Sequence, residues 1–228
     1  MQDLLLLHGA IGSNAQLIPL QQKLEKSFIV HNLNFGAHGD AGTCVNGFSI
    51  ETFANDMLKY IQQNHIDSAN IFGYSMGGYV AMYLAKKHPE RIAKLITLAT
   101  KFYWDGETAA KEVQMLQPAT IEAKLPAFAE MLKQRHGNWK DVLEQTAVML
   151  ENMGEENPLK LDEYATIQHP CLLMLGDKDK MVSLNETVGV FKQLPNAQLC
   201  ILPSTKHPIE QVNVDMLAYH IKAFLTNG

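Results

Sequence analysis

The sequence predicts an α/β fold with a doubly wound, mainly parallel sheet of about six strands. Short apolar runs alternate along the chain with longer segments of helical periodicity, and this alternation is typical of the class. The apolar runs are nearly continuous, as expected for parallel strands that helices cover on both faces. The candidate strands are residues 4–7, 28–31, 70–73, 95–98, 171–175 and 198–202.

Between the strands, several segments carry the apolar stripe of a helix that packs on a sheet. One stripe begins after Ser49, which is a suitable N-cap residue. A second begins after Ser75 and stops before Pro89, because the residue before a proline disfavours helical geometry. Residues 208–225 predict a final helix.

The interval between the fourth and fifth candidate strands breaks the alternation, because it contains no convincing strand. Residues 119–133 and 139–152 have helical spacing instead. We therefore expect a core domain made of residues 1–100 and 167–228, and a helical cap subdomain made of residues 101–166. A run of ordinary surface helices is the alternative interpretation of this insertion.

Composition and charge narrow the classes of protein to consider. The 228 residues are 46% hydrophobic and 19% charged, which is ordinary for a globular protein. A formal net charge of -5 gives no basic surface for nucleic acid or anionic membrane. Cys44, Cys171 and Cys200 form no CxxC pair, which fits a reducing compartment. No apolar run is long enough to cross a bilayer, and the N-terminal leucines lack a basic flank, so we expect a cytoplasmic protein.

The sequence GYSMG, residues 73–77, lies where a candidate strand gives way to a helix. The ordinary role of a serine at that place is to cap the helix. The flanking glycines favour a second interpretation, because they permit a sharp turn in which Ser75 is strained and raised above the carboxyl end of the strand. The first N–H groups of the helix would surround any negative charge that develops there. The pattern therefore predicts that Ser75 is a nucleophile.

With this motif in place, the chain resembles the α/β-hydrolase superfamily over nearly its whole length. The family order of serine, acid and histidine implies that the base is His207, in the loop between the last strand and the last helix. The acid is expected after the penultimate strand, where Asp177 and Asp179 are the two candidates. The register set by Gly176 selects Asp179, and Asp177 is interpreted as a turn residue.

The resemblance also implies an oxyanion hole made of the backbone N–H groups of Met76 and Ala10. Ala10 lies in LLLLHGAIGS, residues 4–13, which resembles the His-Gly loop of the family. His8 is expected to order this loop. In NFGAHGDAG, residues 34–42, His38 is interpreted in the same structural way, as is Asp40. Neither a metal site nor a cofactor is expected.

The superfamily usually has two further strands before the strand that leads into the His-Gly loop, and they are missing from this sequence. We therefore expect six parallel strands in the order 4-3-5-6-7-8 by the family's strand numbers. Because the missing strands lie away from the loops just described, their absence leaves the predicted triad intact.

Together these residues predict acyl transfer, in which Ser75 attacks a carbonyl carbon and water later cleaves the acyl-enzyme. Ile11, Tyr103 and Trp104 are expected to bind a small or medium apolar substrate, although the aromatic residues could instead anchor the cap. The predicted function is hydrolysis of carboxylic esters. Thioesterase, C–C bond hydrolase and perhydrolase activities are alternatives, as is a small-molecule receptor with a weakly active triad. The oligomeric state is left open.

Overall fold

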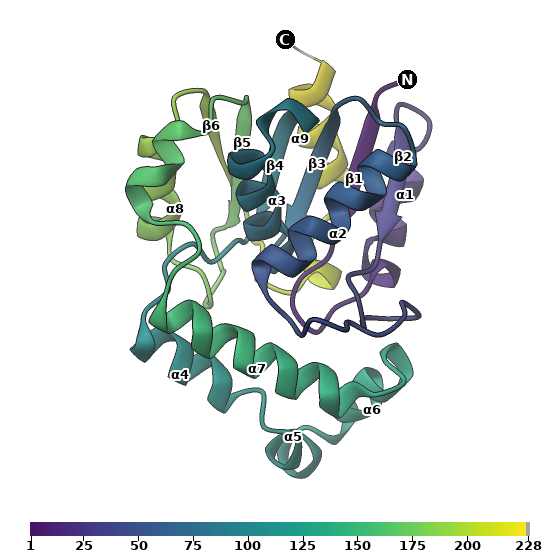
Figure 1. Ribbon diagram of the computed structural model, residues 1–228, viewed down its shortest axis with the longest axis vertical. Helices are drawn as coiled ribbons and strands as arrows, with labels where there is room; N and C mark the ends of the chain where they lie inside the picture. Colours follow the sequence, from purple (N-terminus) through teal and green to yellow (C-terminus); the bar gives the residue numbers. More distant parts are fainter. Residues whose placement is uncertain (227–228) are drawn as a thin grey trace.

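The computed structural model describes residues 1–226, and its centre is one six-stranded sheet (Figure 1). The strands are β1 (Asp3–Leu7), β2 (Ile29–Leu33), β3 (Ala69–Tyr74), β4 (Ile92–Leu98), β5 (Cys171–Gly176) and β6 (Ala197–Leu202). They follow the order β2-β1-β3-β4-β5-β6, and every neighbouring pair is parallel. The predicted parallel sheet and its strand order are therefore confirmed.

Helices cover both faces of the sheet and bury alternate residues of each strand. Leu5 and Leu7 of β1 point into the cluster formed with α2 (Ile50–Gln63), α3 (Met76–Lys87) and α8 (Leu184–Gln193). Leu4 and Leu6 point into the cluster on the opposite face, formed with α1 (Ile18–Leu24) and α9 (Val214–Thr226). All four leucines are fully buried, and burial of one such side chain stabilises a fold by about 1.5–3 kcal/mol.

The ends of the covering helices follow local sequence signals. The Ser49 hydroxyl accepts a hydrogen bond from the Thr52 N–H at 2.9 Å, so Ser49 caps α2 as predicted. Helix α9 begins later than the predicted residue 208. The reason is that Asn213 caps it by accepting from the Met216 N–H at 3.0 Å. Residues 1–226 also contain four short 3-10 helices: Asn14–Leu17, Pro89–Arg91, Leu161–Thr166 and Ile209–Gln211.

Between β4 and β5 the chain forms four helices, which Figure 1 shows below the carboxyl ends of the strands. They are α4 (Gly106–Gln114), α5 (Pro118–Lys124), α6 (Pro126–Arg135) and α7 (Trp139–Glu155). The segment 119–133, for which helical spacing was expected, forms two helices, because Pro126 lacks the N–H that a continuous helix needs and begins α6 instead.

The domain boundaries predicted at residues 101–166 and 167–228 remain predictions, and residues 227–228 lie outside the described part of the chain. In the described range, no helix combines the length and the apolar character that a bilayer crossing requires.

Candidate active site

Ser75 occupies the turn between β3 and α3 and has an unusual backbone conformation. Its φ is +52° and its ψ is −117°, a region that residues with a side chain rarely adopt. The Ser75 N–H donates to the Leu98 carbonyl at 2.8 Å, and the Thr100 hydroxyl donates to the Ser75 carbonyl at 3.0 Å. The end of β4 and the residues after it therefore hold the strained turn in place.

Gly73 and Gly77 make this turn possible because both lie against other backbone. A Cβ atom on Gly73 would lie 2.4 Å from the carbonyl carbon and oxygen of Gly77. A Cβ atom on Gly77 would lie 2.5 Å from the carbonyl oxygen of Leu7 and 2.6 Å from that of His8. A side chain on Gly73 would push β3 and α3 apart, and a side chain on Gly77 would push β1 and α3 apart.

The Ser75 hydroxyl does not cap α3, although serine hydroxyls elsewhere in the fold do cap helices. Ser183 accepts from the Glu186 N–H at 3.2 Å at the start of α8, as Ser49 does at the start of α2. Ser75 makes no such side-chain cap bond. It lines a cavity at the carboxyl ends of the strands instead. The geometry therefore does not support helix capping as the role of Ser75.

His207 and Asp179 come together across the ends of β5 and β6. His207 Nδ1 lies 2.8 Å from Asp179 Oδ2, and the aspartate side chain is fully shielded from solvent. The other carboxylate oxygen, Oδ1, accepts from the Met181 N–H at 2.8 Å and the Val182 N–H at 2.9 Å. Such a carboxylate holds the imidazole with a proton on Nδ1, which leaves Nε2 free to accept a proton.

Two opposing effects act on the ionisation of Asp179. Burial of the carboxylate raises its pKa, whereas hydrogen bonds from His207, Val182 and Met181 and the nearby imidazole charge lower it. Together, the hydrogen bonds and the charge lower the pKa by more than burial raises it, so the pKa of Asp179 lies below its ordinary value. The site therefore keeps a negative charge behind His207 at neutral pH.

Asp177, the rival acid, has a different place. Its Oδ1 accepts from the Thr205 N–H at 3.1 Å, and its Oδ2 lies 3.6 Å from the Lys178 ammonium. The Lys178 N–H in turn donates to the Thr205 carbonyl at 3.0 Å. Asp177 thus joins the loop after β5 to the loop that carries His207.

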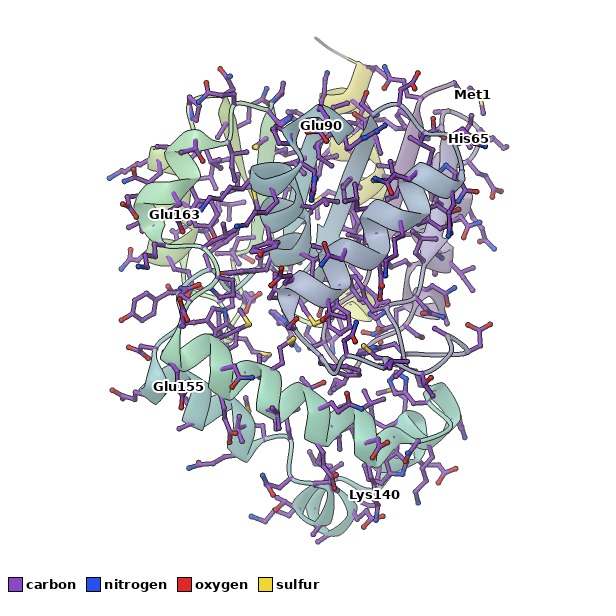
Figure 2. All side chains as sticks on the ribbon, viewed as in Figure 1. Met1, His65, Glu90, Lys140, Glu155 and Glu163 are labelled. Carbon is purple, nitrogen blue, oxygen red and sulfur yellow. The ribbon has the colours of Figure 1, made fainter. Side chains whose placement is uncertain are left out.

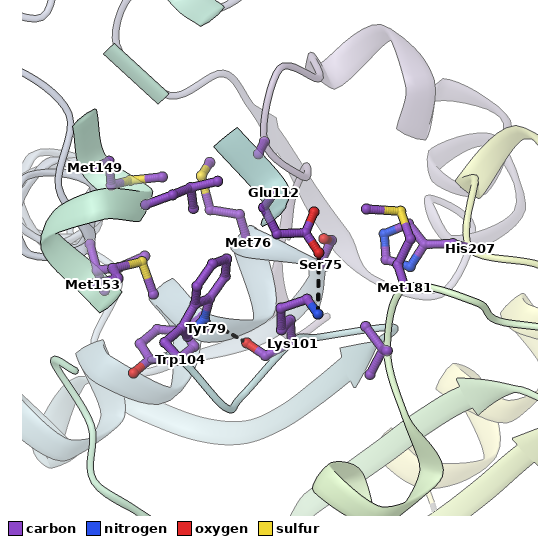
Figure 3. Close-up of a pocket in the computed structure, with 14 residues that line it drawn as sticks. Ser75, Met76, Tyr79, Lys101, Trp104, Glu112, Met149, Met153, Met181 and His207 are labelled. Carbon is purple, nitrogen blue, oxygen red and sulfur yellow. Dashed lines mark hydrogen bonds and ion pairs between the residues drawn. The ribbon is translucent and has the colours of Figure 1, made fainter. Parts of the chain in front are cut away.

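Ser75 and His207 line one cavity, shown in Figure 3. The cavity is small, with a volume of about 80 Å³. Helices α4 and α7 of the insertion supply part of its wall. Its apolar lining is Ala10, Ile50, Met76, Trp104, Met149, Leu150, Met153, Met181 and Val182. Tyr79 and a charged pair, Lys101 and Glu112, complete it.

Both residues predicted to form the oxyanion hole, Ala10 and Met76, lie at this cavity. Met76 is the first residue of α3, so its N–H has no partner inside the helix. The loop that contains Ala10 is ordered by His8, whose Nε2 accepts from the Phe35 N–H at 3.2 Å and whose Nδ1 lies 2.8 Å from the Gly9 carbonyl. His8 therefore has the structural contacts that the sequence analysis expected.

The three residues predicted to bind substrate have different positions. Trp104 lines the cavity, and its Nε1 donates to the Lys101 carbonyl at 3.2 Å. Tyr103 is 58% exposed, and its hydroxyl donates to Asp105 at 2.8 Å on the outside of the molecule. Tyr103 and its neighbour Phe102 face a different pocket, on the side of α8, and Tyr103 does not line the cavity of Ser75. Ile11, which has a φ of +50°, packs against the apolar cluster of the insertion and does not line the cavity either.

Sequence reasoning missed the contacts between the insertion and the His-Gly loop. The Ile11 carbonyl accepts from Arg135 Nη1 at 3.1 Å and from His136 Nε2 at 2.9 Å. His136 Nδ1 accepts from the Gly39 N–H at 2.9 Å, so this imidazole is neutral. The end of α6 thereby ties the His-Gly loop, which lies beside Ser75, to the loop that contains Gly39. The only sequence signal for these contacts is the position of Arg135 and His136, which follow directly after the apolar stripe of α6.

Three buried histidines lie next to the same loops. The ring of His38 lies 5.1 Å from that of His8 and 5.6 Å from that of His136. Burial lowers the pKa of His38 to about 4, and it also lowers the pKa values of His8 and His136. Asp40, from the same predicted turn, accepts from the Asn34 amide at 2.7 Å. Within residues 1–226, the structure contains no cluster of three or more His, Cys, Asp or Glu side chains that could hold a metal ion.

Comparison with known proteins agrees with this architecture. The family model for the alpha/beta hydrolase fold matches residues 4–152. A dihydrolipoyllysine-residue acetyltransferase component of an acetoin cleaving system from Pseudomonas putida is 26% identical over 95% of this chain, which spans only 62% of that relative's length. A pimeloyl-[acyl-carrier protein] methyl ester esterase from Vibrio parahaemolyticus is 25% identical, over 97% of this chain and 93% of the relative. Among solved structures, a thermophilic esterase from Thermogutta terrifontis has a TM-score of 0.81 at 20% identity, over 99% of this chain and 89% of that chain.

Proposed function

The chain belongs to the alpha/beta hydrolase fold family, and we propose that it is a serine hydrolase of carboxylic esters. One observation carries this proposal. The uncapped hydroxyl of Ser75 lines the same cavity as His207, whose Nδ1 lies 2.8 Å from the buried Asp179 carboxylate. A hydroxyl nucleophile needs a base beside it and a group that orients the base, and these three residues supply that set.

In the proposed mechanism each of these groups acts in turn. His207 Nε2 takes the proton of the Ser75 hydroxyl as the serine oxygen attacks the ester carbonyl carbon. The N–H groups of Ala10 and Met76 bind the oxyanion that forms. His207 then gives the proton to the departing alcohol, which leaves an acyl group on Ser75. Water, activated by the same imidazole, attacks the acyl group and releases the carboxylic acid.

The substrate class is proposed from the cavity and from the relatives. Because the lining is mainly apolar, it suits a small or medium acyl chain. The relative from Vibrio parahaemolyticus is named as a methyl ester esterase, which supports an ester as the bond that is cleaved. Thioesterase, C–C bond hydrolase and perhydrolase activities would use the same groups of this chain, so a substrate panel has to compare them with ester hydrolysis.

The direct experiment measures hydrolysis of p-nitrophenyl acetate and p-nitrophenyl butyrate by the wild-type protein and by Ser75→Ala. We expect turnover that falls by at least about 100-fold in the variant, because a covalent nucleophile is lost. Ser49→Ala is the matched control, since it removes a serine hydroxyl at another helix start. It should cost about 1 kcal/mol of stability and keep the activity.

A fluorophosphonate probe followed by mass spectrometry of the labelled peptide locates the nucleophile independently of the substrate. Labelling of the peptide that contains Ser75 supports the proposal. Equal turnover by wild type and Ser75→Ala contradicts it. A stoichiometric burst of p-nitrophenol without further turnover would instead favour a receptor that keeps a weakly active triad.

A further inference from the structure

Lys101 and Glu112 form an ion pair in the wall of the cavity that contains Ser75. Lys101 Nζ lies 3.3 Å from Glu112 Oε1, and the dashed line in Figure 3 marks this contact. The two side chains are only 17% and 12% exposed. Four methionines and other apolar side chains make up most of the surrounding wall. The pair therefore places full charges in an otherwise apolar pocket.

Structural stability gives little reason for charges in this place. Burial removes both groups from water, and the cost often equals or exceeds the attraction between them. Apolar side chains of similar size would fill the same volume without that cost. In a binding pocket, a few charged groups fix the orientation of a ligand that is otherwise apolar. The pair is therefore better explained by recognition of a substrate than by stabilisation of the fold.

The two partners are held differently. The Lys101 carbonyl accepts from Trp104 Nε1 at 3.2 Å, and the next residue, Phe102, donates its N–H to Glu186 of α8 at 3.0 Å. Glu112 lies in the last turn of α4, where the helix dipole disfavours a negative charge. Glu112 is thus the partner that a second anion would displace: Lys101 stays paired in the exchange, whereas Glu112 loses its counter-ion, which the bound carboxylate has to offset.

On the basis of the proposed function, we propose that the preferred substrates are half-esters of dicarboxylic acids, whose free carboxylate replaces Glu112 at Lys101. The acyl part stays attached to Ser75 after the alcohol has left, so it is the acyl part that must fit inside the cavity. The apolar walls contact the methylene groups between the two ends. The ester carbonyl then lies at Ser75 and the carboxylate at Lys101.

The test compares matched methyl esters by release of methanol. The half methyl esters of succinate, adipate and suberate are measured beside the methyl esters of the fatty acids of equal length. Methyl 6-aminohexanoate provides a cationic counterpart. We expect kcat/KM to be highest for one of the half-esters. Lys101→Met should lower the ratio of that kcat/KM to the value for the matching fatty acid ester by about 10- to 100-fold, which is typical of a lost charged hydrogen bond.

Glu112→Gln is the second variant, and it should act in the opposite direction. Without the competing carboxylate, the same ratio should rise by a few-fold. The matched control is Lys140→Met. Lys140 Nζ lies 3.1 Å from Glu122 Oε1, and the lysine side chain is 49% exposed. Figure 2 shows Lys140 on the outside of the insertion. Its loss should leave the ratio unchanged.

Several outcomes overturn the inference. An unchanged ratio in Lys101→Met means that the lysine does not bind the carboxylate. A preference for methyl 6-aminohexanoate that disappears in Glu112→Gln assigns the pocket to cations. If apolar esters are hydrolysed in a Ser75-dependent way and no half-ester is preferred, this inference fails while the proposed function stands. If the wild-type protein hydrolyses no ester at all, the proposed function itself fails.

Discussion

Replacing Asp179 by asparagine preserves the shape of the side chain but changes the hydrogen bonds that it can make. In the native site, one carboxylate accepts from three donors: His207 Nδ1 at 2.8 Å, the Met181 N–H at 2.8 Å and the Val182 N–H at 2.9 Å. An asparagine has only one oxygen. If that oxygen stays with the two backbone N–H groups, the amide NH2 faces Nδ1 and forces the imidazole proton onto Nε2. The base can then no longer take a proton from Ser75.

The size of the effect follows from the cost of the other orientation. Turning the amide oxygen toward His207 restores the correct tautomer but leaves two buried backbone N–H groups facing an NH2 group. Each unsatisfied donor costs about 1–3 kcal/mol. The active arrangement is therefore disfavoured by about 2–6 kcal/mol, which corresponds to a loss of about 30-fold to about 10⁴-fold in kcat/KM.

The assay is hydrolysis of p-nitrophenyl butyrate by Asp179→Asn, with Asp177→Asn as the matched control. The Asp177 carboxylate accepts one hydrogen bond, from the Thr205 N–H, and the amide oxygen of an asparagine can accept the same bond. Its variant should keep activity within about three-fold of wild type, because it touches neither Ser75 nor His207. Thermal unfolding checks that both variants are folded. If Asp179→Asn retained more than a tenth of the activity, or if Asp177→Asn lost as much, this reasoning would be refuted.

Three other expectations concern the surroundings of the site. Gly77→Ala should destabilise the fold by at least about 1–3 kcal/mol in urea unfolding, because its Cβ would meet backbone at 2.5 Å. Gly106→Ala, whose Cβ meets nothing within 4 Å, should stay within about 0.5 kcal/mol of wild type. The pKa of His38 falls to about 4 on folding, so the unfolded chain binds more protons at this group below about pH 6.5. His38 alone should therefore contribute a loss of about 3 kcal/mol of wild-type stability between pH 6.5 and 4, in addition to any loss from His8 and His136. His38→Phe should make the fall in stability less steep in urea titrations at each pH. Arg135→Met should lower kcat/KM by roughly 10-fold through loss of the bond to the Ile11 carbonyl, and an unchanged rate would show that this contact does not position the loop.

Much of this architecture could be predicted because its signals are local. Apolar runs indicated the six strands, and the glycines around Ser75 mark a sharp turn at the end of β3. Asp179 and His207 follow the last two strands, and parallel strands bring their carboxyl ends to one edge. This register brings the two loops together, and the resemblance to the family chose Asp179 over Asp177 and His207 among the histidines.

Features that depend on the direction of a loop or helix could not be predicted. Tyr103 and Trp104 are neighbours of similar character, yet one faces solvent and the other the cavity. The pairing of Lys101 with Glu112 depends on the direction of the chain between β4 and α4, and no periodic pattern of apolar residues predicts that direction. The same holds for the contact from α6 to Ile11, since residues more than a hundred positions apart meet there.

The double hydrogen bond at the Ile11 carbonyl sets a limit on module exchange in this protein. A chimera that took its four insertion helices from another hydrolase would lose both donors at the end of α6. Such a chimera would change the shape of the pocket and, at the same time, make the position of the neighbouring Ala10 N–H less fixed. Selection for new substrates is therefore expected to work more easily through single side chains on α4 and α7 than through recombination of the whole segment.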